Sequence, residues 1–495
     1  MPAPPKRRLS PYLWSFSTYF AEGFPYTIIR TISSVFFRDR GMSLEAIGLT
    51  SMYGLPWILK FLWAPQVDAY GTKRTWLLGS EGVLVLFLLA TALLAPLRQA
   101  PLLIALLFFF AAFVAATHDV AIDGYYLEAL DKKGQSKFVG YRVMAYRIAM
   151  MTGTGIIITM GTRIGWTPAF AGSFAIFFLL FCFHLLHLPE CQRPGKPFGT
   201  LFEHACRPGY LKWPAAVAAV ILLLRFLTGL PLYQALTDKV PGLNSFTFSA
   251  WIGLSLLASL IIVALYRRKI TAWLTRDQES YYAGAFLSFM DREKMPAILM
   301  FIIFIRTGEF MLSSMAAPFM VDLGIKVHYG WISGAVGLPC SILGALIGGW
   351  LISRFSLHRM IWPFLLAQNF TNLVYMALAF SLGNYLTINT GNPNPAPLGA
   401  AHLFTIAAVH GFDQLAGGLG TAVLMTFLMR LCKESHKAAH YAIGTGLMSV
   451  SGLYAGVLSG FLASWFGYGY FFGISFLMSV PGMLLIPLLP KKELN

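Results

Sequence analysis

Five acidic residues lie inside stretches that otherwise consist of apolar side chains, and their types and spacing could do chemistry. These acids are Glu22, Asp119, Asp123, Glu309 and Asp413. A charged side chain at the centre of a bilayer costs about 2.5–3.5 kcal/mol even on lenient insertion scales. Such residues persist where they face a wet cavity or pair with each other, and they usually mark the path of a substrate or proton. We therefore interpret them as proton-coupling or cavity residues.

Asp119 and Asp123 are four residues apart and share one face of a helix. Two close carboxylates in a low-dielectric site cannot both ionise cheaply, which suits a proton-coupling site. Arg142 and Arg147, on the next segment, are the nearest candidate counter-ions. The alternative is a permanent salt-bridge cluster that holds the two helices together.

Arg306 and Glu309 are three residues apart, so they either neutralise each other or act separately. In the second case Arg306 would hold a substrate carboxylate and Glu309 would be the proton site. Glu22 has no cation within four residues on its own helix, and Gly23 and Pro25 loosen that helix. Glu22 is therefore expected to face the cavity.

The remaining candidates are polar or aromatic residues near these acids. For substrate binding or charge compensation they are Arg30, Arg147, Arg306, Tyr26, Tyr126 and Gln414. Asp413 is surrounded by glycines that permit close helix approach. His118 and His410 lack metal-site spacing, so no metal is expected. No nucleotide-binding loop or catalytic motif occurs, which indicates a non-enzyme without cofactors that depends on an ion gradient.

Composition places these residues in a membrane protein. The 495 residues are 57% hydrophobic and only 12% charged, whereas soluble domains carry about 25% charged residues. Apolar stretches of about 20 residues predict an all-α polytopic membrane protein with fourteen transmembrane helices. They lie near 12–37, 44–64, 75–97, 101–130, 138–160, 166–188, 213–234, 246–268, 296–320, 329–353, 359–382, 400–431, 438–464 and 468–489.

The basic residues predict the orientation. The net charge of +16 arises from 37 Lys and Arg residues, which lie mostly in short loops between apolar segments. This pattern argues against nucleic-acid binding and follows the excess of positive charge in cytoplasmic loops. The loops rich in Lys and Arg lie on the cytoplasmic side when both termini are cytoplasmic, so we predict this orientation. The five cysteines show no zinc spacing, and disulfides are not expected.

Short internal echoes indicate two halves. The Gly-Leu-Pro at 54–56 recurs at 337–339, and Asp119 and Tyr141 are echoed in the same order by Asp413 and Tyr441. Parallel six-helix halves are the plan of the major facilitator fold. We predict a cytoplasmic tail (1–11), an N-terminal half (12–189), a linker with two extra membrane helices and a cytoplasmic amphipathic segment (190–295), a C-terminal half (296–490) and a C-terminal tail (491–495).

Several stretches resemble the AmpG muropeptide permeases, a family of the major facilitator superfamily. They are Ala21–Pro25, Lys60–Pro65, the loop with Asp68, Tyr70, Lys73 and Arg74, the pair Asp119 and Asp123, and Tyr146-Arg147. Known members import the disaccharide-peptide debris of murein turnover across the bacterial inner membrane with the proton gradient. The resemblance implies functional roles for Asp119, Asp123 and Arg147. Glu22 departs from it, because the family pattern there is small and neutral, as do the two extra helices.

The sequence thus predicts a monomeric, multi-pass inner-membrane importer of amino-sugar peptides driven by protons. The alternatives are a carrier of another large polar ligand (a siderophore, an acyl-coenzyme A or a peptide) and a receptor that binds without transporting. Asp68, Lys73 and Arg74 are the expected gating loop, in which a charge pair latches the two halves in the outward-open state. An ordinary loop that only sets orientation is the alternative.

Overall fold

The computed structural model describes residues 10–40, 53–97, 100–190, 195–200, scattered positions between 219 and 235, and 281–490 with short gaps at 326–327, 329–330, 391 and 393–395. The described chain is helical, and it divides into two compact units. Unit 1 comprises Met1–Phe198 together with Cys432–Ile443, and unit 2 comprises Gly199–Leu431 with Gly444–Asn495.

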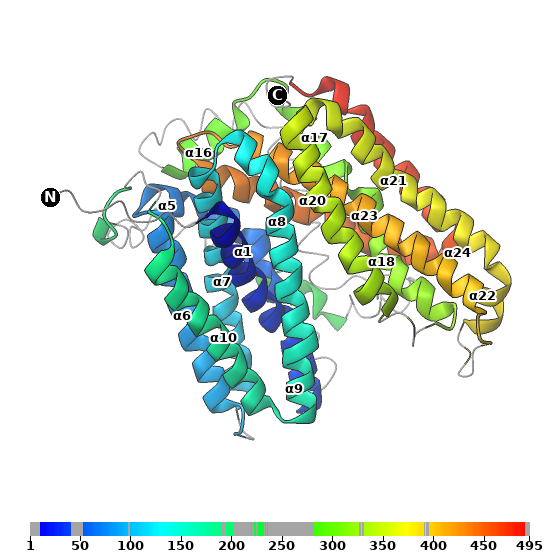
Figure 1. Ribbon diagram of the computed structural model, residues 1–495, viewed down its shortest axis with the longest axis horizontal. Coiled ribbons are helices and arrows are strands. Elements are labelled where there is room, and N and C mark those ends of the chain that lie inside the picture. The colour runs from blue at the N-terminus through cyan, green and yellow to red at the C-terminus, as the bar shows by residue number, and fades with distance from the viewer. Residues whose placement is uncertain are drawn as a thin grey trace. The chain divides into compact units, whose positions relative to one another are not determined.

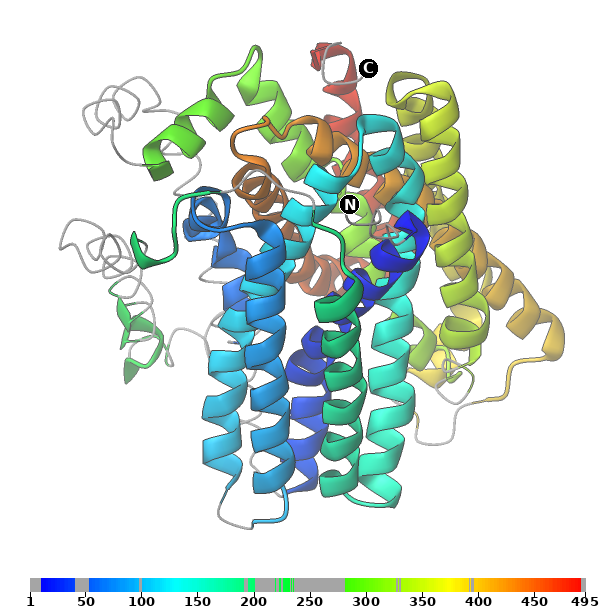
Figure 2. The same cartoon turned by 60° about the vertical axis from the view of Figure 1, so that its left-hand side comes forward.

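Unit 1 is a bundle in which α1 packs against α7, α8 and α10, and α6 packs against α7 and α10 (Figures 1 and 2). Its elements are α1 (Pro11–Thr27), the π-helical turn η1 (Ile28–Ile32), α2 (Ser33–Asp39), α4 (Leu55–Leu59), η3 (Lys60–Leu62), α5 (Ala64–Ala69), α6 (Lys73–Leu94), α7 (Pro101–Ala129), α8 (Lys132–Met151), η4 (Thr152–Ile157), α9 (Ile158–Arg163) and α10 (Trp166–His187). The start of α24 (Lys437–Leu484) also belongs to unit 1.

Unit 2 is built around α23, which packs along α20 and α21. Its elements are α16 (Tyr281–Met290), α17 (Met295–Phe304), α18 (Thr307–Asp322), η6 (Ile332–Gly337), α20 (Leu338–Phe355), α21 (Leu357–Ser381), α22 (Gly383–Asn389), α23 (Ala400–Arg430), the rest of α24 and η7 (Ile486–Leu488). α24 contains a kink at Gly467, where φ is 71°.

Local sequence explains where several helices begin. Proline opens α1 and α7, where its missing N–H is no loss because the first helical N–H groups have no intrahelical partner. The hydroxyl of Thr72 accepts from the N–H of Thr75 at the start of α6, and Asp131 caps α8 by accepting from Gly134. These caps place the polar residues of the two loops at the ends of the apolar helices.

Each unit has its own apolar core, rich in aromatic rings. Phe24, Phe108 and Phe170 are among the buried residues of unit 1, and Phe319 and Tyr375 among those of unit 2. Many other large apolar side chains are exposed, as expected of helices that face lipid.

Ten of the described helical stretches are long and apolar enough to span a membrane. The first predicted segment is also helical, from α1 through α2. The prediction of fourteen transmembrane helices is therefore not confirmed in number. Of the two extra helices, 246–268 and most of 213–234 lie outside the described residues. Within the predicted linker, α16 occupies the stretch whose aromatic spacing indicated an amphipathic segment.

Candidate functional site

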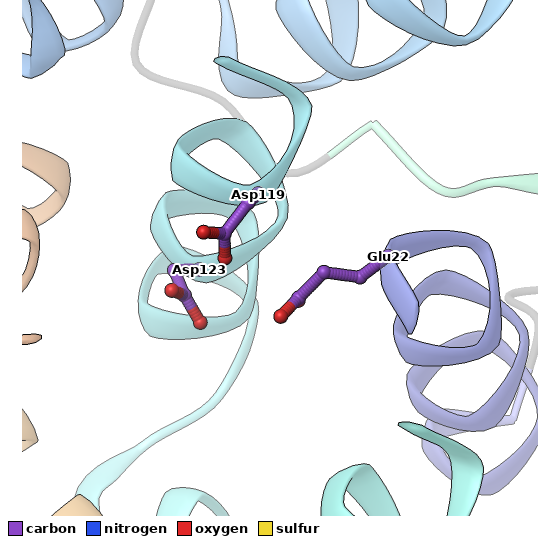
Figure 3. Close-up of side chains that lie close together, drawn as sticks. All are labelled: Glu22, Asp119 and Asp123. Atoms are coloured by element: carbon purple, nitrogen blue, oxygen red, sulfur yellow. The ribbon is translucent and has the colours of Figure 1, made fainter. Parts of the chain in front are cut away.

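Three predicted acids meet within unit 1. Glu22 projects from α1 toward Asp119 and Asp123 on α7, as Figure 3 shows. One carboxylate oxygen from each residue lies within 4.8 Å of the others. The spacing of four residues puts both aspartates on the face of α7 that meets α1. The structure therefore brings together three of the five acids singled out from the sequence.

Two buried cations neutralise the aspartates. Lys60, in η3, donates from Nζ to Oδ2 of Asp119 at 2.6 Å. Arg142, on α8, donates from Nη2 to Oδ1 of Asp123 at 2.8 Å. The hydroxyl of Tyr19 also donates to Asp123, at 2.9 Å. All four charged side chains of these two ion pairs are less than a tenth exposed. Both aspartates therefore have direct counter-ions within the bundle.

Glu22 is the acid left over. Its Oε2 is buried and has no hydrogen-bond partner among the described residues. With both aspartates paired, three carboxylates face two cations, and the cluster is neutral only when it also holds one proton. An uncompensated charge inside an apolar bundle is costly, so binding a proton is the cheap way to remove it. Each of the two cations occupies one oxygen of the aspartate with which it pairs.

The positions of the cations refine the sequence interpretation. Arg147, one of the two candidate counter-ions, lies on α8 and has interactions of its own. Arg142 is the residue that pairs with Asp123. Lys60 belongs to the stretch Lys60–Pro65 that resembles the AmpG permeases, but the sequence interpretation did not include it among the site residues. The sequence contained an indication of this role, because a lysine within an apolar segment needs an acidic or polar partner.

Aromatic rings surround the cluster. The Arg142 guanidinium lies 4.3 Å from the ring centre of Tyr19 and 5.2 Å from that of Tyr126. Tyr126 is buried and donates to the carbonyl of Gln135, so it supports the cation. Tyr26 packs against Trp57 on α4 with ring centres 5.0 Å apart. Arg30 lies in η1, and its guanidinium occupies the space that a side-chain carbon at Gly54 would need.

Unit 2 holds the other two acids in different environments. Arg306 and Glu309, at the start of α18, form a two-pronged ion pair with each other, so the neutralising alternative is the arrangement observed. Asp413 on α23 is buried and accepts from the amide of Gln414 at 3.2 Å. No described lysine or arginine forms an ion pair with Asp413.

The glycines beside Asp413 permit close helix packing, as predicted. A side-chain carbon at Gly418 would collide with the backbone of α20 at Ser341, and one at Gly344 would collide with the backbone of Leu415. One turn before Asp413, Nδ1 of His410 hydrogen-bonds the hydroxyl of Tyr375 at 2.9 Å. This contact places His410 against α21.

The expected gating residues form two separate contacts in unit 1. Asp68 accepts from the N–H groups of Ala438 at 3.1 Å and Ala439 at 2.7 Å, in the first turn of α24, and pairs with Lys73 at 2.9 Å. A carboxylate is favourable there because helix N-termini present free N–H groups and a positive dipole end. Arg74 instead donates to the carbonyls of Leu185 and Leu188 at the end of α10.

A second buried polar cluster, which the sequence interpretation missed, lies in unit 1. Nδ1 of His184 on α10 is 2.7 Å from Oε1 of Glu81 on α6, and its Nε2 is 2.9 Å from the Ser17 hydroxyl on α1. Nε2 of His118 lies 3.4 Å from the same Glu81 oxygen. Glu81 is one charged residue within a long apolar stretch, and that was the available signal.

Comparisons with known proteins point to transport. The family model described as "Major Facilitator Superfamily" matches residues 15–276. The "Anhydromuropeptide permease" of Escherichia coli (strain K12) is 22% identical over 475 residues, which cover 94% of this chain and 77% of the relative. The "Putative transporter AmpG 4" of Rickettsia conorii is 22% identical over 95% of this chain and 94% of that protein.

A solved structure shares the fold. The major facilitator proton:xylose symporter XylE, bound to 6-bromo-6-deoxy-D-glucose, superposes with a TM-score of 0.60 over 97% of this chain and 95% of its own. The sequences are only 12% identical, so this likeness concerns the fold alone.

Proposed function

The chain belongs to the major facilitator superfamily, and we propose that it is a proton-coupled importer of murein-derived amino-sugar peptides. It is a multi-pass membrane transporter with a small-molecule substrate, and not an enzyme. The resemblance to the AmpG permeases that the motifs indicated is confirmed over nearly the full length. The substrate, the coupling ion and the inward direction belong to the proposal.

One observation carries proton coupling, namely the charge balance around Glu22. The ion pairs Lys60–Asp119 and Arg142–Asp123 are complete, and Glu22 lies close to them without a cation partner among the residues that the structure describes. A transporter that moves one proton needs a group that is neutral in one step and charged in the next. Glu22 is the candidate for this group, because its Oε2 has no hydrogen-bond partner among the described residues whereas each aspartate has a cation. Asp413, also buried without a described cation partner, is the corresponding candidate in unit 2.

The substrate class is supported by the names of the relatives and by aromatic side chains near the cluster. The rings of Tyr26 and Trp57 supply flat apolar surfaces that suit sugar rings. A peptide carboxylate needs a cation, and Arg30 lies about two helical turns from Glu22 along the first helical segment. We assign substrate contacts to Tyr26, Trp57 and Arg30.

The surroundings of the protein complete the proposal. We assign the chain to the bacterial inner membrane as a monomer with both termini cytoplasmic, on the basis of its basic loops. The proton gradient is the energy source, and no cofactor takes part. Asp68 acts as a gate at the cytoplasmic side, because holding the first turn of α24 restrains a helix whose remainder belongs to unit 2.

A transport assay separates proton coupling from substrate binding. In proteoliposomes, wild-type protein should accumulate labelled anhydro-muropeptide when an inward proton gradient is imposed, and a protonophore should abolish this accumulation. Glu22→Gln, which resembles the protonated form, should lose accumulation but retain counterflow, the exchange of labelled for unlabelled substrate. Glu293→Gln, at an exposed acid outside the cluster, is the matched control. Accumulation by Glu22→Gln equal to that of wild type would refute the coupling role.

The same preparation tests the substrate class. A ligand that binds the native state raises its thermal stability. Anhydro-muropeptides should raise the unfolding temperature, whereas siderophores, acyl-coenzyme A and peptides should not. A shift with one of those ligands instead, together with its counterflow, would reassign the substrate. A shift without any counterflow would indicate a receptor.

A further inference from the structure

Residues beyond the end of α10 form an isolated β-bridge with the gating loop. The N–H of Lys196 donates to the carbonyl of Ala69 at 2.8 Å, and the N–H of Gly71 donates to the carbonyl of Lys196 at 2.8 Å. The N–H of Gly195 donates to the carbonyl of Gly71 at 2.9 Å. Together these bonds make a parallel bridge between Tyr70 and Lys196. We call residues 195–198 the linker strap.

Side chains reinforce the backbone bonds. Gly71 has φ 61°, a conformation that favours glycine, and the ring of Phe198 occupies the space that a side chain there would need. The same ring packs against Trp76, with ring centres 5.2 Å apart. Trp76 in turn donates from Nε1 to the carbonyl of Tyr70 at 2.7 Å. The strap therefore contacts the loop through backbone hydrogen bonds and through the ring of Phe198.

The strap acts on the residue directly after Asp68. Ala69 is the last residue of α5, and its carbonyl accepts the Lys196 N–H. Asp68 must be held in one orientation to accept two N–H groups of α24 and the Lys73 ammonium together. The side chain of Lys196 is exposed, so its backbone makes the contact. Unit 1 ends at Phe198, and the chain then enters unit 2.

We propose that the linker strap is a positioning element of the cytoplasmic gate, which fixes the loop so that Asp68 can hold the first turn of α24. The strap connects the gate to the linker between the halves. Displacement of the strap would therefore release Asp68 from the first turn of α24. The proposal rests on the gating role assigned to Asp68. It does not depend on which substrate is carried.

The test compares two variants of one exposed position in the full-length protein. Lys196→Pro removes the N–H that reaches Ala69, whereas Lys196→Ala keeps it. Amide hydrogen exchange at Ala438 and Ala439 reports directly on their bonds to Asp68. Loss of one hydrogen bond predicts exchange roughly three- to tenfold faster in Lys196→Pro and unchanged in Lys196→Ala.

A folding control and a second variant accompany this comparison. Exchange in the middle of α7 should stay as in wild type, which shows that unit 1 remains folded. If Lys196→Pro raises exchange there too, Gly195→Ala replaces it, because a side-chain carbon would press on the carbonyls of Ala69 and Gly71 at 2.7 Å. Wild-type exchange at Ala438 and Ala439 in whichever variant keeps α7 as in wild type overturns the proposal. Equal increases in α7 and α24 in both Lys196→Pro and Gly195→Ala also overturn it.

Asp68→Asn separates this proposal from the one it rests on. It should accelerate exchange at the same two amides and alter transport. Faster exchange without any change in transport would refute the gating role of Asp68. The contribution of the strap to the position of Asp68 would then still be measured by the Lys196 pair of variants.

Discussion

The ion pair between Lys60 and Asp119 makes a quantitative prediction for Lys60→Met. Methionine keeps the length of the apolar stem and removes the charge, so Asp119 loses its counter-ion at 2.6 Å. Both side chains are less than a tenth exposed, so water cannot replace the lost partner. Breaking such a buried pair costs about 3–5 kcal/mol.

Proton uptake sets an upper limit on this cost. Asp119 can escape its unpaired charge by binding a proton from solution. For an ordinary aspartic acid with a pKa of about 3.9, protonation costs about 4 kcal/mol at pH 7 and about 2 kcal/mol at pH 5.5. Lys60→Met should therefore lose no more than about 4 kcal/mol of unfolding free energy at pH 7, and about half of that loss should disappear at pH 5.5.

Thermal unfolding of the purified protein, followed by tryptophan fluorescence at both pH values, measures the effect. The double variant Lys60→Met/Asp119→Asn has no orphaned charge and should recover most of the lost stability at pH 7. The reasoning fails if the double variant is as unstable as Lys60→Met. It also fails if the loss in Lys60→Met is the same at both pH values.

Two further predictions concern other buried groups. His184→Ala leaves Oε1 of Glu81 without its 2.7 Å hydrogen-bond partner and should destabilise the protein by about 1–3 kcal/mol. The double variant Glu81→Gln/His184→Ala should recover part of this loss. Chemical or thermal unfolding measures both variants, and equal losses would contradict the prediction. Burial, with help from Lys433, lowers the pKa of His436 below its ordinary value, although Asp68 opposes the shift. The closed gate thus favours neutral His436, and acidification below about pH 6.5 should weaken it. Hydrogen exchange at the first amides of α24, corrected for the intrinsic exchange rate, should rise on acidification in wild type but not in His436→Gln. Identical pH dependence of exchange in the two proteins would argue against a role for His436 in the gate.

Much of the fold could be predicted from the sequence because it depends on local composition. A run of about 20 apolar residues is a membrane helix in any context, since its backbone must satisfy its own hydrogen bonds. The pair Arg306–Glu309 could likewise be anticipated, because three residues along one helix bring the groups together. The shared face of Asp119 and Asp123 follows from the same helix geometry.

The partners of the acids were decided by tertiary structure. Lys60 and Asp119 come from different helices, and so do Arg142 and Asp123. From the sequence, Arg142 and Arg147 were both candidate counter-ions, and the packing of α8 on α1 brings Arg142 to Asp123. The cluster of Glu81, His118 and His184 joins three helices, so no one segment contains its signal.

Sequence alone therefore determined that charged residues lie within an apolar, membrane-spanning chain, because hydropathy is a property of each segment. It could not determine which of those charges remain uncompensated. Coulomb and hydrogen-bond energies depend on distances of a few ångströms between side chains, and packing between helices sets those distances. Tertiary structure paired both aspartates and, within the described part of the chain, left Glu22 without a cation.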